Sequence, residues 1–350
     1  MKRKTHLTND YIFESNKRQN TISMKNVSVH RSSIILIISI GCGLIFSTII
    51  ISAIIIPSYA VSPMTTKNIT TALLPNFRFA AAGDWACNSN TISTVKSIVK
   101  ANPNLVLGLG DYYYSDYLNE SRNPDCWFKI VKPIVQKMRI AIGNHESESP
   151  SLLKLFMNHF NLTNQYYSFN YQNVHFVALS AEIPLGIGSE QYNFVKSDLA
   201  KAASSPNINW IIAFYHRKAY SSPSIVLPFA SVRDTYHPLF DKYHVDLVLN
   251  TDMHNYQRSY PIKYNSINST KPVIINTDTS NYTNPQGRIY VIAGTAGAHF
   301  FPLYGKAPYV ITQYLVHGFL DVTITNSGRT LSAKFYANDG SVKDQFTIQK

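Results

Sequence analysis

Short apolar runs alternate with stretches of helical periodicity in the middle of this chain, and this alternation restricts the fold more than any other feature. Strand-like runs occupy 78–82, 105–109 and 139–142, and apolar residues recur at helical spacing in 91–100 and 127–136. The order strand, helix, strand, helix, strand is typical of βαβ units with parallel strands. The sequence therefore predicts an α/β fold.

The same pattern continues toward the C-terminus and then changes. Further strands are expected at 174–179, 210–214 and 245–250, with helices near 191–202 and 232–243. The last part of the chain is β-rich with little helix, with runs at 288–292, 314–325, 330–336 and 345–348. Both groups of strands are expected to belong to one domain.

The formal net charge of +12 would be typical of a protein with an anionic partner. Its meaning depends on where the charged residues lie along the chain. The first 33 residues carry seven Lys or Arg against two Asp or Glu, a net charge of 7 − 2 = +5. The rest of the chain therefore carries +7, a basicity that fits attraction of small anions and does not call for nucleic acid. A hydrophobic content of 45% excludes intrinsic disorder, and three cysteines exclude a Cys₄ zinc module.

Residues 34–56 form an apolar segment without a charged side chain. A helix of this length spans about 34 Å, enough to cross a hydrocarbon core about 30 Å thick. Because basic residues stay on the cytoplasmic side, we expect a cytoplasmic tail at 1–33, a transmembrane signal-anchor at 34–56, a linker at 57–75 and an extracytoplasmic domain at 76–350. The alternative is a secreted protein that is cleaved near Ala60.

Two further features suit an extracytoplasmic domain. Cys87 and Cys126 are the cysteines outside the apolar segment, and in an oxidising compartment they would form a single disulfide. Asn-x-Ser/Thr glycosylation patterns are compatible with export, although chance produces several in an Asn-rich chain; they start at Asn68, Asn119, Asn161, Asn268 and Asn281.

Side chains that can ligate metal follow five of the expected strands directly. They are Asp84, Asp111, Asn144, His216 and the pair Asp252 and His254. A single Asp after a strand is more often a cap or turn residue, but ligands bind at the carboxyl ends of strands in open α/β sheets. Five such coincidences favour one converging site. Converging carboxylates would repel each other without a cation, so the pattern indicates a metal cluster.

The sequence blocks around these residues resemble those of the calcineurin-like metallophosphoesterases, and within them the purple acid phosphatases. The blocks are Gly83-Asp84, Gly110-Asp111, Gly143-Asn144-His145-Glu146, His216-Arg217 and Thr251-Asp252-Met253-His254. The purple acid phosphatase branch has a Tyr three residues after the second Asp, which is Tyr114 here. The resemblance covers about 76–350 and implies a four-layer αββα sandwich of two mixed β-sheets.

The resemblance also implies a ligand set for two metal ions. The first ion would be held by Asp84, Asp111, Tyr114 and His254, and the second by Asp111, Asn144, His216 and Asp252, with Asp111 bridging. A tyrosine ligand implies Fe(III) in the first site, with a divalent Fe, Mn or Zn ion in the second. The run Tyr112 to Tyr114 could instead be aromatic packing.

The implied function is that of a metal-dependent phosphoric ester hydrolase of the acid phosphatase type. The dinuclear centre would activate a hydroxide for in-line attack on a small phosphomonoester. His145 would protonate the leaving group or hold the phosphate, or else only position its neighbour, and Arg217 and His299 are candidates for substrate binding. A phosphodiesterase or nucleotidase on the same fold is the alternative enzyme.

One ligand position departs from the family pattern. The block would read Gly-His-Asp-His, whereas this chain has Thr251-Asp252-Met253-His254. Asp252 could ligate the second metal through oxygen, or reach it only through water and leave a weak second site. In the third interpretation, the chain has lost catalysis and binds phosphate esters only.

Overall fold

The computed structural model describes residues 74–114 and 124–350. The expected tail, the apolar segment 34–56 and nearly all of the linker lie outside these residues, as do two glycosylation patterns, at Asn68 and Asn119. Among the residues that the structure describes, no helix is both long and apolar enough to cross a membrane.

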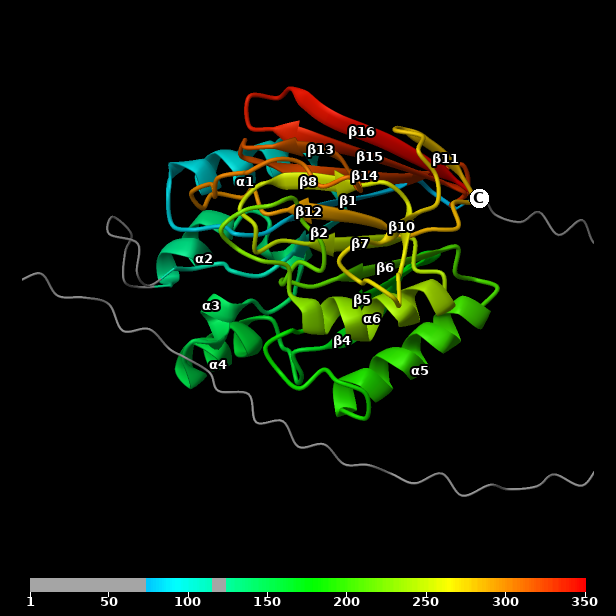
Figure 1. Cartoon of the computed structure of the whole chain (residues 1–350). Helices are drawn as coiled ribbons and strands as arrows, with labels where there is room; N and C mark the ends of the chain where they lie inside the picture. Colours follow the sequence, from blue (N-terminus) through cyan, green and yellow to red (C-terminus); the bar gives the residue numbers. More distant parts are fainter. Residues whose placement is uncertain (1–73, 115–123) are drawn as a thin grey trace, which may run out of the picture. The chain divides into compact units, whose positions relative to one another are not determined.

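Two mixed sheets of seven strands each form the centre of the fold (Figure 1). The first sheet has the order β11 (Asn281–Thr283), β16 (Val342–Gln349), β15 (Thr330–Ala337), β14 (Gly318–Thr325), β1 (Phe77–Ala82), β2 (Leu105–Gly108) and β3 (Met138–Ile140). The second has the order β13 (Val310–Tyr314), β8 (Tyr256–Ser259), β12 (Ile289–Ala293), β7 (Leu247–Asn250), β6 (Trp210–Phe214), β5 (Val174–Ala178) and β4 (Tyr167–Tyr171). A separate ribbon pairs β9 (Ile262–Lys263) with β10 (Val273–Ile274).

The sheets pack face to face through alternate side chains of their strands. Phe77 and Phe79 of β1 meet Phe176 of β5 in this core, with ring centroids 6.3 and 5.4 Å apart. The intervening side chains along each strand, such as Ala80 of β1 and Ile211 of β6, face the outer side of their sheet and pack under helices. Because both faces are covered, the central strands β2, β6 and β12 are apolar throughout, as expected for parallel strands buried on both sides.

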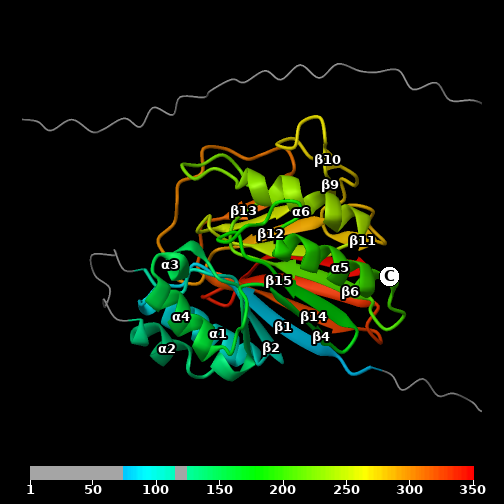
Figure 2. The same ribbon diagram turned by 90° about the horizontal axis from the view of Figure 1, so that it is seen from below.

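Helices cover the outer face of each sheet, and the order of layers is αββα. The first sheet is covered by α1 (Ser89–Ala101), α2 (Asp125–Val131) and α4 (Pro150–His159), and the second by α5 (Glu190–Ser204) and α6 (Ala230–Lys242). Seen from below, α5 and α6 lie in front of the strands, and α1 to α4 gather at one end of the molecule (Figure 2). The short helix α3 (Asn144–Ser147) begins at a predicted metal ligand. The expected fold class, an α/β sandwich of two mixed sheets, is confirmed.

The parallel strands bring their carboxyl ends to the same edges. In the first sheet β1, β2 and β3 are parallel neighbours, and in the second β5, β6, β7 and β12 are. Every predicted metal ligand except Tyr114 lies within four residues of the end of one of these strands. Because of this topology, residues from distant parts of the chain lie close together at the carboxyl ends of the parallel strands.

Two expected elements have different bounds in the structure. The helix expected at 127–136 ends at Val131, because Pro133 lacks the N–H needed to continue the ladder, and a 3₁₀ turn follows at Val135–Lys137. The run 314–325 is divided between β13 and β14, which belong to different sheets. An apolar run does not show by itself that the chain crosses from one sheet to the other.

Cys87 and Cys126 form a disulfide, as expected, across a sequence separation of 39 residues. It ties the start of α1 to α2 on the outer face of the first sheet. Closing a loop of this length stabilises a fold mainly by restricting the unfolded chain.

We expect Cys126→Ser to lower the free energy of unfolding by about 2–4 kcal/mol, the usual range for a native disulfide. Chemical denaturation monitored by circular dichroism measures this change. Cys87→Ser should give an equal loss, and the double variant should lose no more than either single one. A double variant that loses the sum of both would show that the two cysteines act independently.

Candidate metal centre

Three buried side chains form the centre of the predicted site. Ligand atoms of Asp84, Asp111 and His216 all lie within 4.8 Å of one another, and all three residues are at most 2% exposed. Asp84 follows β1, Asp111 follows β2 and His216 follows β6, so the cluster joins both sheets. His216 Nε2 lies 3.1 Å from Asp111 Oδ2, and His216 Nδ1 lies 3.9 Å from Asp84 Oδ1.

Backbone strain marks the same loops. Asp84, Asp111 and Asp252 have φ angles of 55°, 50° and 65°, in the left-handed region that residues other than glycine seldom adopt. Asp tolerates this region better than most residues. Strain of this kind persists only where the surrounding structure fixes it, and it is concentrated at functional sites.

Tyr114 and His254 lie together beside Asp84. The Tyr114 hydroxyl is 3.1 Å from His254 Nε2 and 3.5 Å from Asp84 Oδ1. His254 Nδ1 is 2.6 Å from the carbonyl oxygen of His299, which leaves Nε2 directed at the site. Burial lowers the pKa of His254 to about 4, so its imidazole is neutral and has a lone pair for a metal.

Asn144 and His216 meet on the other side of Asp111. Asn144 Oδ1 is 3.1 Å from His216 Nε2. The opposite ring nitrogen, His216 Nδ1, is 2.7 Å from Thr251 Oγ1, whose hydroxyl donates to the carbonyl of Leu109. Thr251 therefore accepts from Nδ1–H and orients Nε2 toward the site.

Asp252 lies near His216 but is held by two cations. Its Oδ1 is 3.6 Å from His216 Nε2 and accepts from Arg217 Nη1 at 3.1 Å, while Oδ2 accepts from Lys218 Nζ at 2.5 Å. Burial acts to raise the pKa of Asp252, but His216 and Lys218 outweigh it and hold the pKa below its usual range. Asp252 is therefore ionised.

His145 and His299 differ in how they approach the cluster. The backbone N–H of His145 donates to Asp111 Oδ1 at 3.1 Å, and His145 Nε2 is 3.8 Å from Asp111 Oδ2. His145 Nδ1 is 2.5 Å from Glu148 Oε1. His299 contacts the site through its backbone carbonyl, which lies beside His254 Nδ1, and His299 as a whole is exposed.

Glu146 supports the site, a role that the sequence did not suggest. Its buried carboxylate accepts from the backbone N–H groups of Asp111, Tyr112 and Gly143 at 3.0, 2.8 and 2.9 Å. It therefore fixes the loop after β2 against the loop after β3. Burial and the charge of Asp111 raise the pKa of Glu146 to about 8.

The residues present fit a metal ion. Burial raises the pKa of Asp84 well above its usual range, with Asp111 adding to the effect, so two buried carboxylates here need a positive charge. Among the described residues, Asp84 Oδ2 is buried and makes no hydrogen bond. Gly294, directly after β12, keeps the space beside this oxygen open, because a Cβ there would overlap it. Carboxylate, imidazole, amide and phenol donors together suit Fe, Mn or Zn.

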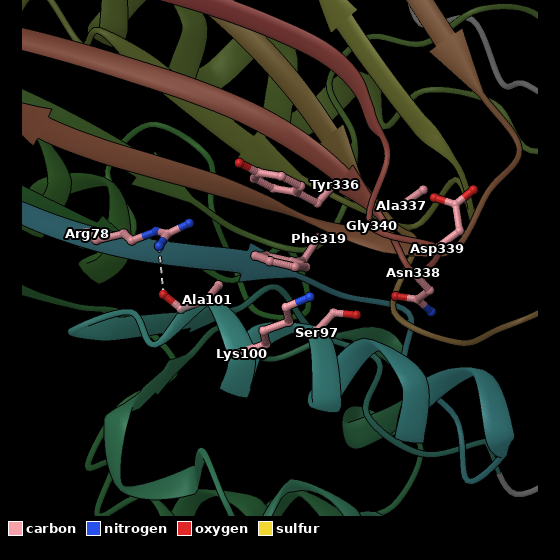
Figure 3. Close-up of a pocket in the computed structure, with 10 residues that line it drawn as sticks. All are labelled: Arg78, Ser97, Lys100, Ala101, Phe319, Tyr336, Ala337, Asn338, Asp339 and Gly340. Carbon is pink, nitrogen blue, oxygen red and sulfur yellow. Dashed lines mark hydrogen bonds between the residues drawn. The ribbon is translucent and has the colours of Figure 1, made fainter.

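A separate hollow of about 340 Å³ lies on the outer face of the first sheet, under α1 (Figure 3). Its basic residues are Arg78, which donates to the Ala101 carbonyl at 2.7 Å and is paired with Asp321, and Lys100. Among the described residues that line this hollow there is no histidine. It therefore lacks the donor set of the metal centre.

Two stacked mixed sheets with carboxylates and imidazoles at the ends of their parallel strands define a fold and site of the metallophosphoesterase class. The chain belongs to the calcineurin-like phosphoesterase family, whose model matches residues 77–256. The matched segment contains every predicted metal ligand.

Curated relatives include purple acid phosphatases. The chain is 29% identical over 233 residues to purple acid phosphatase 15 of Arabidopsis thaliana, an alignment that covers 57% of this chain and 44% of that protein. It is 27% identical over 291 residues to probable inactive purple acid phosphatase 1 of the same plant, covering 74% of this chain and 46% of that protein. The chain thus spans about half the length of these relatives.

A solved structure shares the fold. The purple acid phosphatase PPD1 from yellow lupin (Lupinus luteus) seeds superposes with a TM-score of 0.69 at 23% sequence identity. The superposition covers 79% of this chain and 54% of the lupin chain. The described residues therefore share the fold of the lupin protein, which supports the fold assignment independently of the sequence blocks.

We expect Gly294→Ala to lower the metal content of the purified protein. The added Cβ would overlap Asp84 Oδ2 and force the carboxylate to rotate away from the cluster. Inductively coupled plasma mass spectrometry measures metal per chain. Gly186→Ala is the matched control, because its Cβ would have open space within 4 Å among the described residues. Equal metal content in both variants would contradict a role for Asp84 Oδ2.

Proposed function

We propose that this chain is a metal-dependent phosphoric ester hydrolase of the acid phosphatase type that acts on small phosphomonoesters. The observation that carries the proposal is the convergence of Asp84, Asp111 and His216 at the carboxyl ends of parallel strands from both sheets. The family of the chain supports phosphoester hydrolysis in general. The choice of a monoester is supported by the relatives that are named phosphatases.

The first metal position is formed by Asp84, Asp111, Tyr114 and His254, and the second by Asp111, Asn144, His216 and Asp252. Bound metal ions would supply a hydroxide near neutral pH and stabilise negative charge on the phosphoryl oxygens. We propose Fe(III) for the first position, because the Tyr114 hydroxyl faces both Asp84 and His254. A divalent Fe, Mn or Zn ion would occupy the second.

His145 is the proposed general acid. Nδ1 lies 2.5 Å from Glu148 Oε1 and Nε2 faces the centre on the side of Asp111, so in the imidazolium form the proton on Nε2 points toward the centre. From this position Nε2 can donate its proton to the oxygen of the leaving alcohol as the bond to phosphorus breaks. The side chain is 18% exposed, which lets it exchange protons with solvent.

Arg217 is the proposed phosphate-binding side chain. Its guanidinium is one-quarter exposed and is fixed by Glu182 at 2.9 Å and Asp252 at 3.1 Å. A guanidinium held on one side by carboxylates can present its remaining donors to a phosphate oxygen. The His299 side chain, beside His254 with ring centroids 5.4 Å apart, is a second candidate.

We further propose that the catalytic domain acts outside the cytoplasm, tethered by a transmembrane helix at 34–56. The support is the uncharged apolar segment after a basic tail, together with the Cys87–Cys126 disulfide, which is stable in an oxidising compartment. In this arrangement residues 1–33 remain in the cytoplasm.

The function is tested with the full-length protein, stripped of metal and reloaded with Fe, Mn or Zn. We expect release of p-nitrophenol from p-nitrophenyl phosphate by the loaded protein and none by the metal-free protein or by Asp111→Asn. Faster release from bis(p-nitrophenyl) phosphate would favour the phosphodiesterase alternative. No release from either ester at full metal loading would identify a chain that only binds, as the relatives named inactive suggest.

We expect His145→Asn to slow hydrolysis of an alkyl phosphomonoester by about 10²–10⁴-fold, the usual contribution of a general acid. The effect on p-nitrophenyl phosphate should be much smaller, because that leaving group needs little protonation. Comparison of kcat for the two substrates measures this difference. An equal loss on both substrates would show that His145 positions its neighbours and transfers no proton.

A further inference from the structure

Lys218 is a buried cation at the metal centre that none of the sequence blocks includes. Its side chain is 0% exposed, and its ammonium donates to Asp252 Oδ2 at 2.5 Å and lies 3.4 Å from the Asp252 carbonyl oxygen. The backbone of Lys218 is held as well, because its carbonyl accepts from Phe229 N–H at 2.8 Å. A lysine is almost never fully buried unless it has a partner of opposite charge. Here that partner is Asp252.

Asp252 keeps its other oxygen on the side of the second metal position. Oδ1 lies 3.6 Å from His216 Nε2, which is itself 3.1 Å from both Asp111 Oδ2 and Asn144 Oδ1. Atoms that share one metal ion at bond lengths near 2.1 Å stand about 3–3.6 Å apart. Oδ1 therefore lies at ligand spacing from His216 and also accepts from Arg217 Nη1 at 3.1 Å, while Oδ2 is bonded to Lys218.

We propose that Asp252 and Lys218 act as one unit that replaces the histidine expected at this ligand position. Asp252 supplies Oδ1 to the second metal, and Lys218 holds Oδ2 and balances the added negative charge. A carboxylate with an ammonium sums to zero charge, as a neutral imidazole does, and the second cation on Asp252, Arg217, has its own carboxylate partner in Glu182 at 2.9 Å. Lys218 is thus a positioning residue for the metal centre, and the inference rests on the proposed function only in requiring that this centre binds metal.

The pairing has a consequence for reversion to the family residue. Asp252→His restores the expected ligand but leaves the Lys218 ammonium buried without a carboxylate and close to the bound cations. A buried charge without its partner is strongly destabilising, and it would repel the metal. The single reversion is therefore expected to fail, and removal of the lysine in the same chain is expected to rescue it.

The test is a double-mutant cycle on the full-length protein with wild type, Lys218→Met, Asp252→His and the double variant. Mn²⁺ is titrated onto the metal-free protein by calorimetry, and the melting temperature of the metal-free protein is measured separately. Lys350→Met is the matched control, because it breaks another lysine–aspartate pair, with Asp246 at 2.6 Å, away from the centre. Neither readout needs catalysis.

We expect wild type to bind Mn²⁺ at both positions and Asp252→His to bind the second ion about tenfold more weakly or worse, the usual loss when a group that supports a ligand is disturbed. The metal-free form of Asp252→His should also melt below wild type. The double variant should recover most of both losses, and Lys350→Met should bind Mn²⁺ like wild type.

Three results would overturn the inference. They are an Asp252→His variant equal to wild type in both readouts, a double variant no better than Asp252→His, and a wild type that binds a single Mn²⁺ ion. None of them decides whether the loaded wild type releases phosphate, so failure of the inference is distinguishable from failure of the proposed function.

Discussion

The burial of two carboxylates side by side is the constraint around which the rest of the site is arranged. Asp84 and Asp111 are at most 2% exposed and share His216 as a neighbour. Their mutual repulsion and desolvation oppose this placement unless a positive charge is present. Parallel strands from two mixed sheets bring the aspartates together although both have left-handed backbone, and the three backbone N–H groups that donate to Glu146 hold the loop of Asp111 in place. Such support is expected where the resulting charge density has a use, as a metal site has.

Much of the fold could be predicted from periodicity because central strands such as β2, β6 and β12 are buried on both faces and stand out as apolar runs. The first three strands and the helix α6 lie within a few residues of their expected bounds. The helix α4 was missed although Ser149 caps it and Pro150 begins it, because its apolar pattern is short. Strand β8, Tyr256–Ser259, was missed because its polar side chains are buried by tertiary contacts that local sequence does not show.

The site could be predicted where a strand end carries a ligand, and not where support comes from across the fold. The sequence blocks gave Asp84, Asp111 and His216, which the structure brings together. Gly294 matters because of the space it leaves beside Asp84, 210 positions earlier, and that space exists only in three dimensions. Thr251 occupies a position where the family has glycine, and its hydroxyl orients His216, a contact visible only once both loops are placed.

The change at Asp252 shows why a substituted ligand has to be interpreted together with its surroundings. Taken alone, an aspartate in place of a histidine adds a negative charge and shortens the reach of the side chain, which suggests a damaged site. The structure adds Lys218, two positions after His216, which is buried and bonded to the same carboxylate. A buried ammonium beside a site for metal cations would be energetically unfavourable without a partner of opposite charge. Asp252 is that partner. Asp252 and Lys218 together carry no net charge, as a neutral imidazole does, and this balance is the basis for our proposal that the pair replaces the ligand.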